Sequence, residues 1–225
     1  MAGNLSAAIA QAQTICWDES IGYRMGGMAY SSADGVDCSG LIGRCLHDNG
    51  FNYPSYHVGT ADMVANSMSP VDALGAAGFT EIVVTSPSVQ LQPGDIVVMN
   101  HLDWSGGHTF FYMENIQGYT DPGADSANIG NVQHCKVEAS STRGHTADGD
   151  HRKNGTGAYW EVWVHAYSSL FNGYDPTDPG DQIVIARWPG GLADINGAAA
   201  IIMMTLEAFR RRRDEHAKHN NWSNR

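Results

Sequence analysis

The stretch that decides the fold is Val36-Asp37-Cys38-Ser39-Gly40-Leu41-Ile42. Apolar residues with helical spacing continue from it, so the sequence predicts a helix over residues 37–49 that ends at Gly50. Asp37 is a favourable N-cap residue, which puts Cys38 in the first turn of that helix. Unpaired backbone N–H groups and the helix dipole favour a negative charge there, which suits a thiolate nucleophile. For a lone cysteine, however, buried packing is the commoner explanation.

The composition is that of a globular protein with an uneven distribution of charge. Of the 225 residues, 42% are hydrophobic and only 16% are charged, and the formal net charge is −11. Residues 191–225 carry six bases and four acids, whereas residues 1–190 carry seven bases and twenty acids, a net of −13. Phosphate binding requires clustered Lys and Arg, so the acidic body argues against nucleic acid as a partner.

The four cysteines do not follow the spacing of a zinc site or a redox pair. Cys38 and Cys45 lie two turns apart on one predicted helix, which is too far for a disulfide. A reduced state is therefore the simplest interpretation, and a bond between Cys16 and Cys135 stays open as an alternative.

The termini indicate where the chain is made. Residues 1–12 lack the basic and apolar regions of a secretory signal peptide. The longest apolar run, residues 198–204, is too short to cross a bilayer. We therefore expect synthesis in the cytoplasm without a signal peptide.

Helices are expected first along the chain and strands afterwards, which predicts an α+β domain with an antiparallel sheet. A further helix over residues 198–219 lies outside that core, so we divide the chain into a domain at residues 1–190 and an amphipathic basic tail at residues 191–225. The tail is either a helix with a solvated basic end or a contact with an anionic surface such as lipid or wall polymer. The sequence leaves the oligomeric state open. The expected core helices cover residues 5–17, 37–49, 60–67 and 71–77, and the expected strands cover residues 80–84, 96–99, 108–113, 131–139, 159–167 and 182–188.

A thiolate nucleophile needs a base, and the base needs an orienting group. Among ten histidines, His108 is the best placed, because it follows a Gly-Gly turn where a strand begins. His47 follows Cys38 on the same helix and is expected to point elsewhere, while His57 and His101 lie in predicted loops. A strand-end histidine is also common without any catalytic role.

The orienting group is expected on the strand that follows His108. There His134, Lys136 and Glu138 alternate onto one face. A carboxylate or a second imidazole would accept the Nδ1–H hydrogen bond of His108. A solvated strand face would explain Glu138 equally well without any role.

Four blocks of the chain resemble the NlpC-type peptidoglycan cysteine hydrolases and the related phage amidases and CHAP-type lysins. The Asp-Cys-Ser-Gly block is the specific one, since Gly-Asp and Gly-His are weak signals alone. The resemblance covers about residues 23–140 and implies a papain-like fold, with helices packed on an antiparallel sheet, and cleavage of amide bonds in cell-wall peptides. In order, the blocks are Tyr23-Arg24-Met25-Gly26-Gly27, Asp37-Cys38-Ser39-Gly40-Leu41, Pro93-Gly94-Asp95-Ile96-Val97 and Gly107-His108-Thr109-Phe110-Phe111-Tyr112.

The resemblance assigns a role to individual residues. It gives Cys38 the nucleophile position, His108 the base position and Tyr23 a hydroxyl at the oxyanion site. The third residue of the family is a polar group just before a small Ala-Ser pair, which fits Glu138, although the family often has histidine there and His134 is close by. The further residues assigned to oxyanion or substrate binding are Asp37, Ser39 and Gly107.

Together, these features predict a peptidoglycan hydrolase with a Cys-His-Glu thiol mechanism, either an endopeptidase or an N-acetylmuramoyl-L-alanine amidase. We expect no metal and no cofactor. A wall-directed enzyme without a signal peptide fits a phage endolysin that acts after holin-type release or virion delivery. Two alternatives are a non-catalytic wall-binding or virion structural module, and a metal-dependent wall hydrolase. The metal ligands would then be His145, Asp148, Asp150 and His151, whose spacing matches no strong motif.

Overall fold

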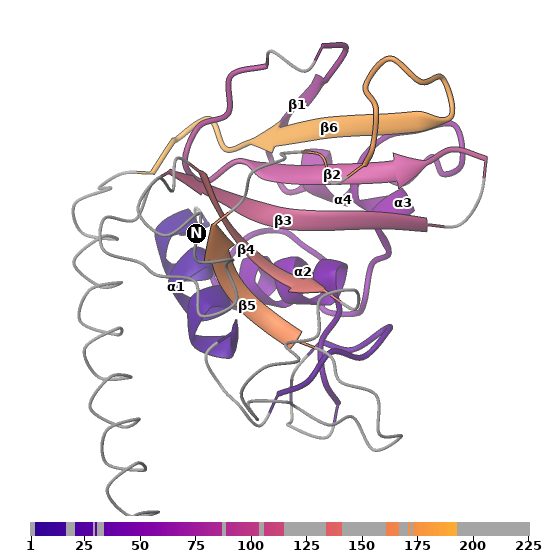
Figure 1. Ribbon diagram of the computed structural model, residues 1–225. Coiled ribbons are helices and arrows are strands. Elements are labelled where there is room, and N and C mark those ends of the chain that lie inside the picture. The colour runs from indigo at the N-terminus through magenta and orange to yellow at the C-terminus, as the bar shows by residue number, and fades with distance from the viewer. Residues whose placement is uncertain are drawn as a thin grey trace, which may run out of the picture.

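The computed structural model describes residues 3–16, 21–28, 30, 34–86, 89–103, 106–114, 134–140, 161–166, 171 and 173–192. Helices come first and strands follow, as the sequence predicts (Figure 1). The helices are α1 (Leu5–Cys16), α2 (Cys38–Asp48), α3 (Thr60–Met63) and α4 (Ala73–Ala76). The strands are β1 (Thr80–Val83), β2 (Ile96–His101), β3 (Gly106–Glu114), β4 (His134–Ser140), β5 (Glu161–Ala166) and β6 (Asp181–Arg187).

The six strands form one sheet in the order β1-β6-β2-β3-β4-β5, and every neighbouring pair is antiparallel. The last strand therefore returns between β1 and β2, which places Asp181 opposite His101. On the other side of β2, Met99 lies opposite His108 of β3. The predicted α+β class with an antiparallel sheet is confirmed, and the insertion of β6 is the feature that the sequence did not reveal.

Helix α2 begins and ends where its sequence predicts. The carboxylate of Asp37 accepts the backbone N–H of Gly40 at 2.7 Å, which satisfies one of the unpaired donors of the first turn. At the other end Gly50 has a φ of 83°, a left-handed conformation that glycine adopts without a steric penalty.

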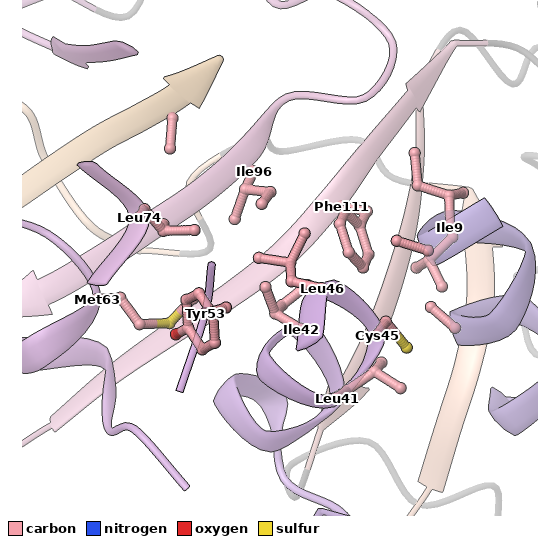
Figure 2. Close-up of a cluster of buried hydrophobic side chains, with 14 of the residues drawn as sticks. Ile9, Leu41, Ile42, Cys45, Leu46, Tyr53, Met63, Leu74, Ile96 and Phe111 are labelled. Atoms are coloured by element: carbon pink, nitrogen blue, oxygen red, sulfur yellow. The ribbon is translucent and has the colours of Figure 1, made fainter. Parts of the chain in front are cut away.

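The apolar stripe of α2 holds the helix against the sheet. Helices α1 and α2 pack against each other, and α2 contacts β3 and β4. Figure 2 shows Ile42 and Leu46 of α2 beside Phe111 of β3, and all three side chains are fully buried. Burying a side chain of this size stabilises a fold by about 1.5–3 kcal/mol. The position of the first residue of α2 is thus fixed by the core behind it.

Helix α3 is shorter than predicted. It ends at Met63 because the side-chain oxygen of Asn66 accepts the backbone N–H groups of Met68 and Ser69, at 2.8 and 3.0 Å, and turns the chain. Thr60, expected as the cap, is instead the first helical residue.

Two other boundaries differ from the prediction. Helix α4 begins at Ala73, because Asp72 accepts the backbone N–H of Gly75 at 2.6 Å and acts as the N-cap. His101, expected in a loop, is the last residue of β2 and pairs with Asp181 of β6.

Several predictions concern residues outside the described part of the chain. These are the helix over residues 198–219, the tail that begins at residue 191, of which only residues 191 and 192 are described, and the loop that contains His145 and His151. Among the helices described above, none is both long and apolar enough to span a membrane.

Candidate active site

Cys38 is the first residue of α2, and its side chain lies at the end of the helix rather than in either hydrophobic cluster of the core. Close packing explains why the residue two positions later, Gly40, is a glycine. A Cβ atom at Gly40 would lie 1.9 Å from the carbonyl oxygen of Gly27, so only glycine allows residues 22–28 to approach the start of the helix. The Asp-Cys-Ser-Gly block therefore places the cysteine and makes room for the segment beside it.

His108 and Glu138 form a close pair next to this helix end. Nε2 of His108 lies 2.6 Å from Oε2 of Glu138, and the two side chains are 14% and 3% exposed. The register of β3 and β4, with Phe111 opposite Val137, puts both residues on one face of the sheet. The predicted contact between the two side chains is present.

The ring nitrogen that makes this contact differs from the prediction. Glu138 binds Nε2 of His108 and not Nδ1, because it lies on the β4 side of the ring. This leaves Nδ1 as the nitrogen that can exchange a proton with the sulfur of Cys38. The side chain of His134, the alternative orienting group, lies outside the described part of the structure.

Cys38 lies close enough to the ring of His108 to affect the pKa of that ring. Burial lowers the pKa of His108, but the charge of Glu138 and the hydrogen bond that the imidazolium donates to the sulfur of Cys38, together with smaller contributions from the same two residues, raise it to about 9. His108 is therefore an imidazolium at neutral pH. A positive charge beside a cysteine suits the position of a nucleophile.

A second histidine–carboxylate pair lies on the other flank of Cys38. The buried carboxylate of Asp37 accepts the backbone N–H of Gly26 at 2.6 Å, in addition to that of Gly40. Nε2 of His57 lies 2.9 Å from the same carboxylate, and the hydroxyl of Ser39 donates to it at 3.1 Å. Asp37 thus joins the start of α2 to two separate loops.

The electrostatics of this second pair follow from these contacts. Burial raises the pKa of Asp37, but the hydrogen bonds from His57, Gly40 and Gly26 together lower it below the ordinary value. The hydrogen bond to Asp37 raises the pKa of His57, against the effect of its burial. Ser39 and His57 also lie within 3.1 Å of each other, so the predicted substrate-binding residues Asp37 and Ser39 already have protein partners.

Tyr23 lies beside the start of α2, as the resemblance implies. It is buried and forms a parallel bridge with Val36, whose N–H donates to the carbonyl of Gly22 at 3.0 Å. The N–H of Arg24 in turn donates to the carbonyl of Val36 at 3.1 Å. These bonds hold the backbone of Tyr23 next to the Asp37-Cys38 pair. The role of its hydroxyl stays a prediction.

Close packing explains why residue 107 is a glycine, which the sequence did not suggest. A Cβ atom there would lie 2.1 Å from Oγ1 of Thr60 and 2.7 Å from the carbonyl oxygen of Met99. Glycine therefore lets β3 approach α3 just before His108. Its predicted contact with substrate stays a prediction.

A third group of side chains lies where β2 ends and β6 begins. His101 stacks on Tyr174 with 4.3 Å between ring centroids, and Nδ1 of His101 lies 2.5 Å from Oδ1 of Asp181. Burial, the charge of Asp181 and the charge of Cys38 raise the pKa of Tyr174 to about 12. Sequence reasoning missed Tyr174, because only the insertion of β6 beside β2 brings it here.

The remaining predicted groups lie elsewhere. His47 lies 3.0 Å from the carbonyl of Tyr53 through Nδ1, away from Cys38 as expected. The thiol of Cys16 donates to the carbonyl of Glu138 at 3.7 Å, while the side chain of Cys135 is outside the described part. Within the described residues, no group of three or more His, Cys, Asp or Glu side chains could hold a metal ion.

The chain is similar to a family of known proteins. A sequence model described as the NlpC/P60 family matches residues 21–146, more than half of the chain. The matched region contains Tyr23, Cys38, His108 and Glu138. Searches of curated proteins and of solved structures found no match.

Proposed function

Because the chain belongs to the NlpC/P60 family, whose members are typically cysteine peptidases acting on peptidoglycan, we propose that it is a cell-wall endopeptidase with Cys38 as its nucleophile. One observation carries the proposal. The imidazole of His108 lies beside Cys38, and its Nε2 lies 2.6 Å from Oε2 of Glu138, whose carboxylate accepts the ring N–H. This is the arrangement of nucleophile, base and orienting group that thiol catalysis needs.

In the proposed reaction the thiolate of Cys38 attacks the carbonyl carbon of a wall-peptide amide. His108 gives its proton to the leaving amine, which leaves an acyl thioester on the cysteine. His108 then takes a proton from water, the resulting hydroxide hydrolyses the thioester to a carboxylic acid, and the thiolate of Cys38 and the imidazolium of His108 are restored. Glu138 keeps the ring oriented and stabilises its positive charge.

The tetrahedral intermediate requires donors for its oxyanion. The backbone N–H of Cys38 is one of the unpaired donors in the first turn of α2. The hydroxyl of Tyr23 is the second donor in this proposal, supported by the bonds that fix its backbone beside Cys38. One such donor is typically worth about 3 kcal/mol in the transition state.

The same chemistry would cut either of two kinds of amide bond. Endopeptidase cleavage breaks a bond within the peptides, whereas N-acetylmuramoyl-L-alanine amidase cleavage separates the peptide from the sugar. The family supports the first, and we keep the second as the alternative. Mass spectrometry of the released wall fragments distinguishes the two, because only amidase cleavage releases glycans that carry no peptide.

The proposed setting is that of a phage endolysin. Peptidoglycan lies outside the cytoplasmic membrane, so an enzyme made in the cytoplasm needs holin-type release or virion delivery to reach it. Expression with and without a co-expressed holin tests this setting. Lysis that occurs only with the holin supports it, and lysis without the holin contradicts it.

Two cysteine variants test the mechanism. Cys38→Ala should abolish the release of new amino groups from purified walls. Cys45→Ala is the matched control, because Cys45 lies on the same helix but is completely buried, and burial raises the pKa of its thiol. That control should keep its activity. Release by Cys38→Ala at the wild-type rate would refute the mechanism, and wall binding by the wild type without any release would instead favour a non-catalytic wall-binding module.

A further inference from the structure

Lys136 is a buried charged residue that the proposed mechanism does not yet use. Only 1% of the residue is exposed. Its Nζ lies 3.8 Å from Oε2 of Glu138 and 4.0 Å from the centre of the Phe110 ring. Lysine is almost never fully buried without a partner, so this placement calls for a physical reason.

The strand register explains how Lys136 reaches this position. Lys136 and Glu138 are two residues apart on β4, so both side chains project from the same face as His108. Tyr112 lies opposite Lys136 on β3, and His165 occupies the opposite position on β5. Among the side chains that the structure describes, the titratable and charged groups on this face around Lys136 are therefore Glu138, His108 and Tyr112, with Cys38 of α2 beyond His108.

Burial makes the contact between His108 and Glu138 vulnerable to neutralisation. A desolvated carboxylate next to an imidazolium can take its proton, which leaves two uncharged groups. A neutral His108 would no longer stabilise a thiolate at Cys38. A positive charge 3.8 Å from the carboxylate opposes this transfer, because it favours the ionised form of Glu138. The face of Phe110 compensates the ammonium in part for its lost hydration.

We propose that Lys136 is a positioning residue for the reaction, whose buried ammonium keeps the Glu138 carboxylate ionised and directed at Nε2 of His108. The inference rests on the proposed function and extends it. Lys136 acts through Glu138 and has no contact with substrate in this account. In this account the charges alternate from the ammonium of Lys136 through the carboxylate of Glu138 and the imidazolium of His108 to the thiolate of Cys38.

The test removes the positive charge of Lys136 while keeping a side chain of similar volume. Lys136→Met removes the positive charge that opposes this transfer, so the proton of His108 should pass to Glu138 and the neutral ring should no longer stabilise the thiolate. The acid limb of the profile of kcat/KM against pH should therefore move upward by about one unit, a loss of roughly tenfold on the acid side. Lys136→Gln is the second neutral variant, for the case that Lys136→Met does not fold. Lys136→Arg keeps the charge, so its limbs should stay at the wild-type pH.

A matched control removes a different, partly buried ion pair. Arg187 lies 2.8 Å from Asp95 through Nη2, and β2 and β3 separate its strand β6 from β4, which puts it roughly 14 Å across the sheet from Lys136. Arg187→Met should lower the melting temperature and leave both limbs of the pH profile in place. Lys136→Met or Lys136→Gln behaving in the same way would mean that Lys136 is merely structural, and the inference would be overturned.

A second measurement separates this inference from the proposed function. The rate at which iodoacetamide alkylates Cys38 can be followed against pH in the folded protein, whether or not the protein cuts peptidoglycan. Lys136→Met should shift that profile upward as well. If the wild type does not cut peptidoglycan but Lys136→Met still shifts the alkylation profile, the peptidase is contradicted and the inference is not. If the wild type is active but Lys136→Met leaves the alkylation profile unshifted, the inference alone is contradicted.

Discussion

Two histidine–carboxylate pairs flank the cysteine, and they have different tasks. His108 and Glu138 lie 2.6 Å apart, and His57 and Asp37 lie 2.9 Å apart. Cys38 affects the pKa of His108, and the carboxylate of Glu138 faces the buried Lys136. Asp37, by contrast, accepts two backbone N–H groups and a hydroxyl besides His57. The further partners of each pair therefore indicate which pair does chemistry and which holds loops to the start of α2.

The largest expected difference between the pairs is in catalysis. His108→Ala should lower kcat by about 10²–10⁴-fold, the usual contribution of a general acid–base residue. His57→Ala should lower it by less than about tenfold, because His57 contacts Asp37 and Ser39 and acts on their geometry alone. Release of amino groups from purified walls measures both. Equal losses in the two variants would show that the pairs share the chemistry.

A smaller effect is expected from the orienting carboxylate. Glu138→Gln removes the charge that raises the pKa of His108 to about 9, so that pKa should fall toward the ordinary imidazole value near 6.5. The imidazolium form is present below this pKa. The alkaline limb of kcat/KM should therefore move to lower pH. A limb that stays near pH 9 would assign the raised pKa to another group.

The smallest expected effect is on the pH dependence of stability. The raised pKa of His57 gives stabilisation that is complete below the unfolded value of 6.5 and is lost as the pH rises through the folded value. The lowered pKa of Asp37 gives stabilisation that is present above 3.8 and is lost on acidification. His57→Ala should thus cost more free energy of unfolding at pH 5.5 than at pH 8.5, as urea titrations would measure. A cost that is larger at pH 8.5 would contradict the ion pair.

The parts of this site that the sequence predicted are local ones. Asp37 and Gly50 mark the ends of α2 within a few residues, and period-two alternation puts Glu138 on one face of β4 with Lys136, which the register with β3 makes the face of His108. Whether Nε2 or Nδ1 of His108 contacts Glu138 depends on the rotamer of the His108 side chain, which a pattern of residue spacings does not encode.

The parts that the sequence missed depend on distant segments meeting. His57 reaches Asp37 from a loop twenty residues later, and Tyr174 reaches the site because β6 inserts beside β2. Long-range pairing of this kind follows from how the whole core packs. The resemblance in four short blocks nevertheless identified the family, because those blocks contain the residues that the helix end and the sheet bring together.

The most direct test of the central claim is alkylation of the whole protein with iodoacetamide, with occupancy of Cys38 read by peptide mass spectrometry and activity read on the same samples. Activity should fall in proportion to the fraction of Cys38 that is modified, while EDTA in a parallel sample leaves it unchanged. Full activity in protein whose Cys38 is completely alkylated would contradict the account, and loss of activity to EDTA alone would favour the metal-dependent alternative.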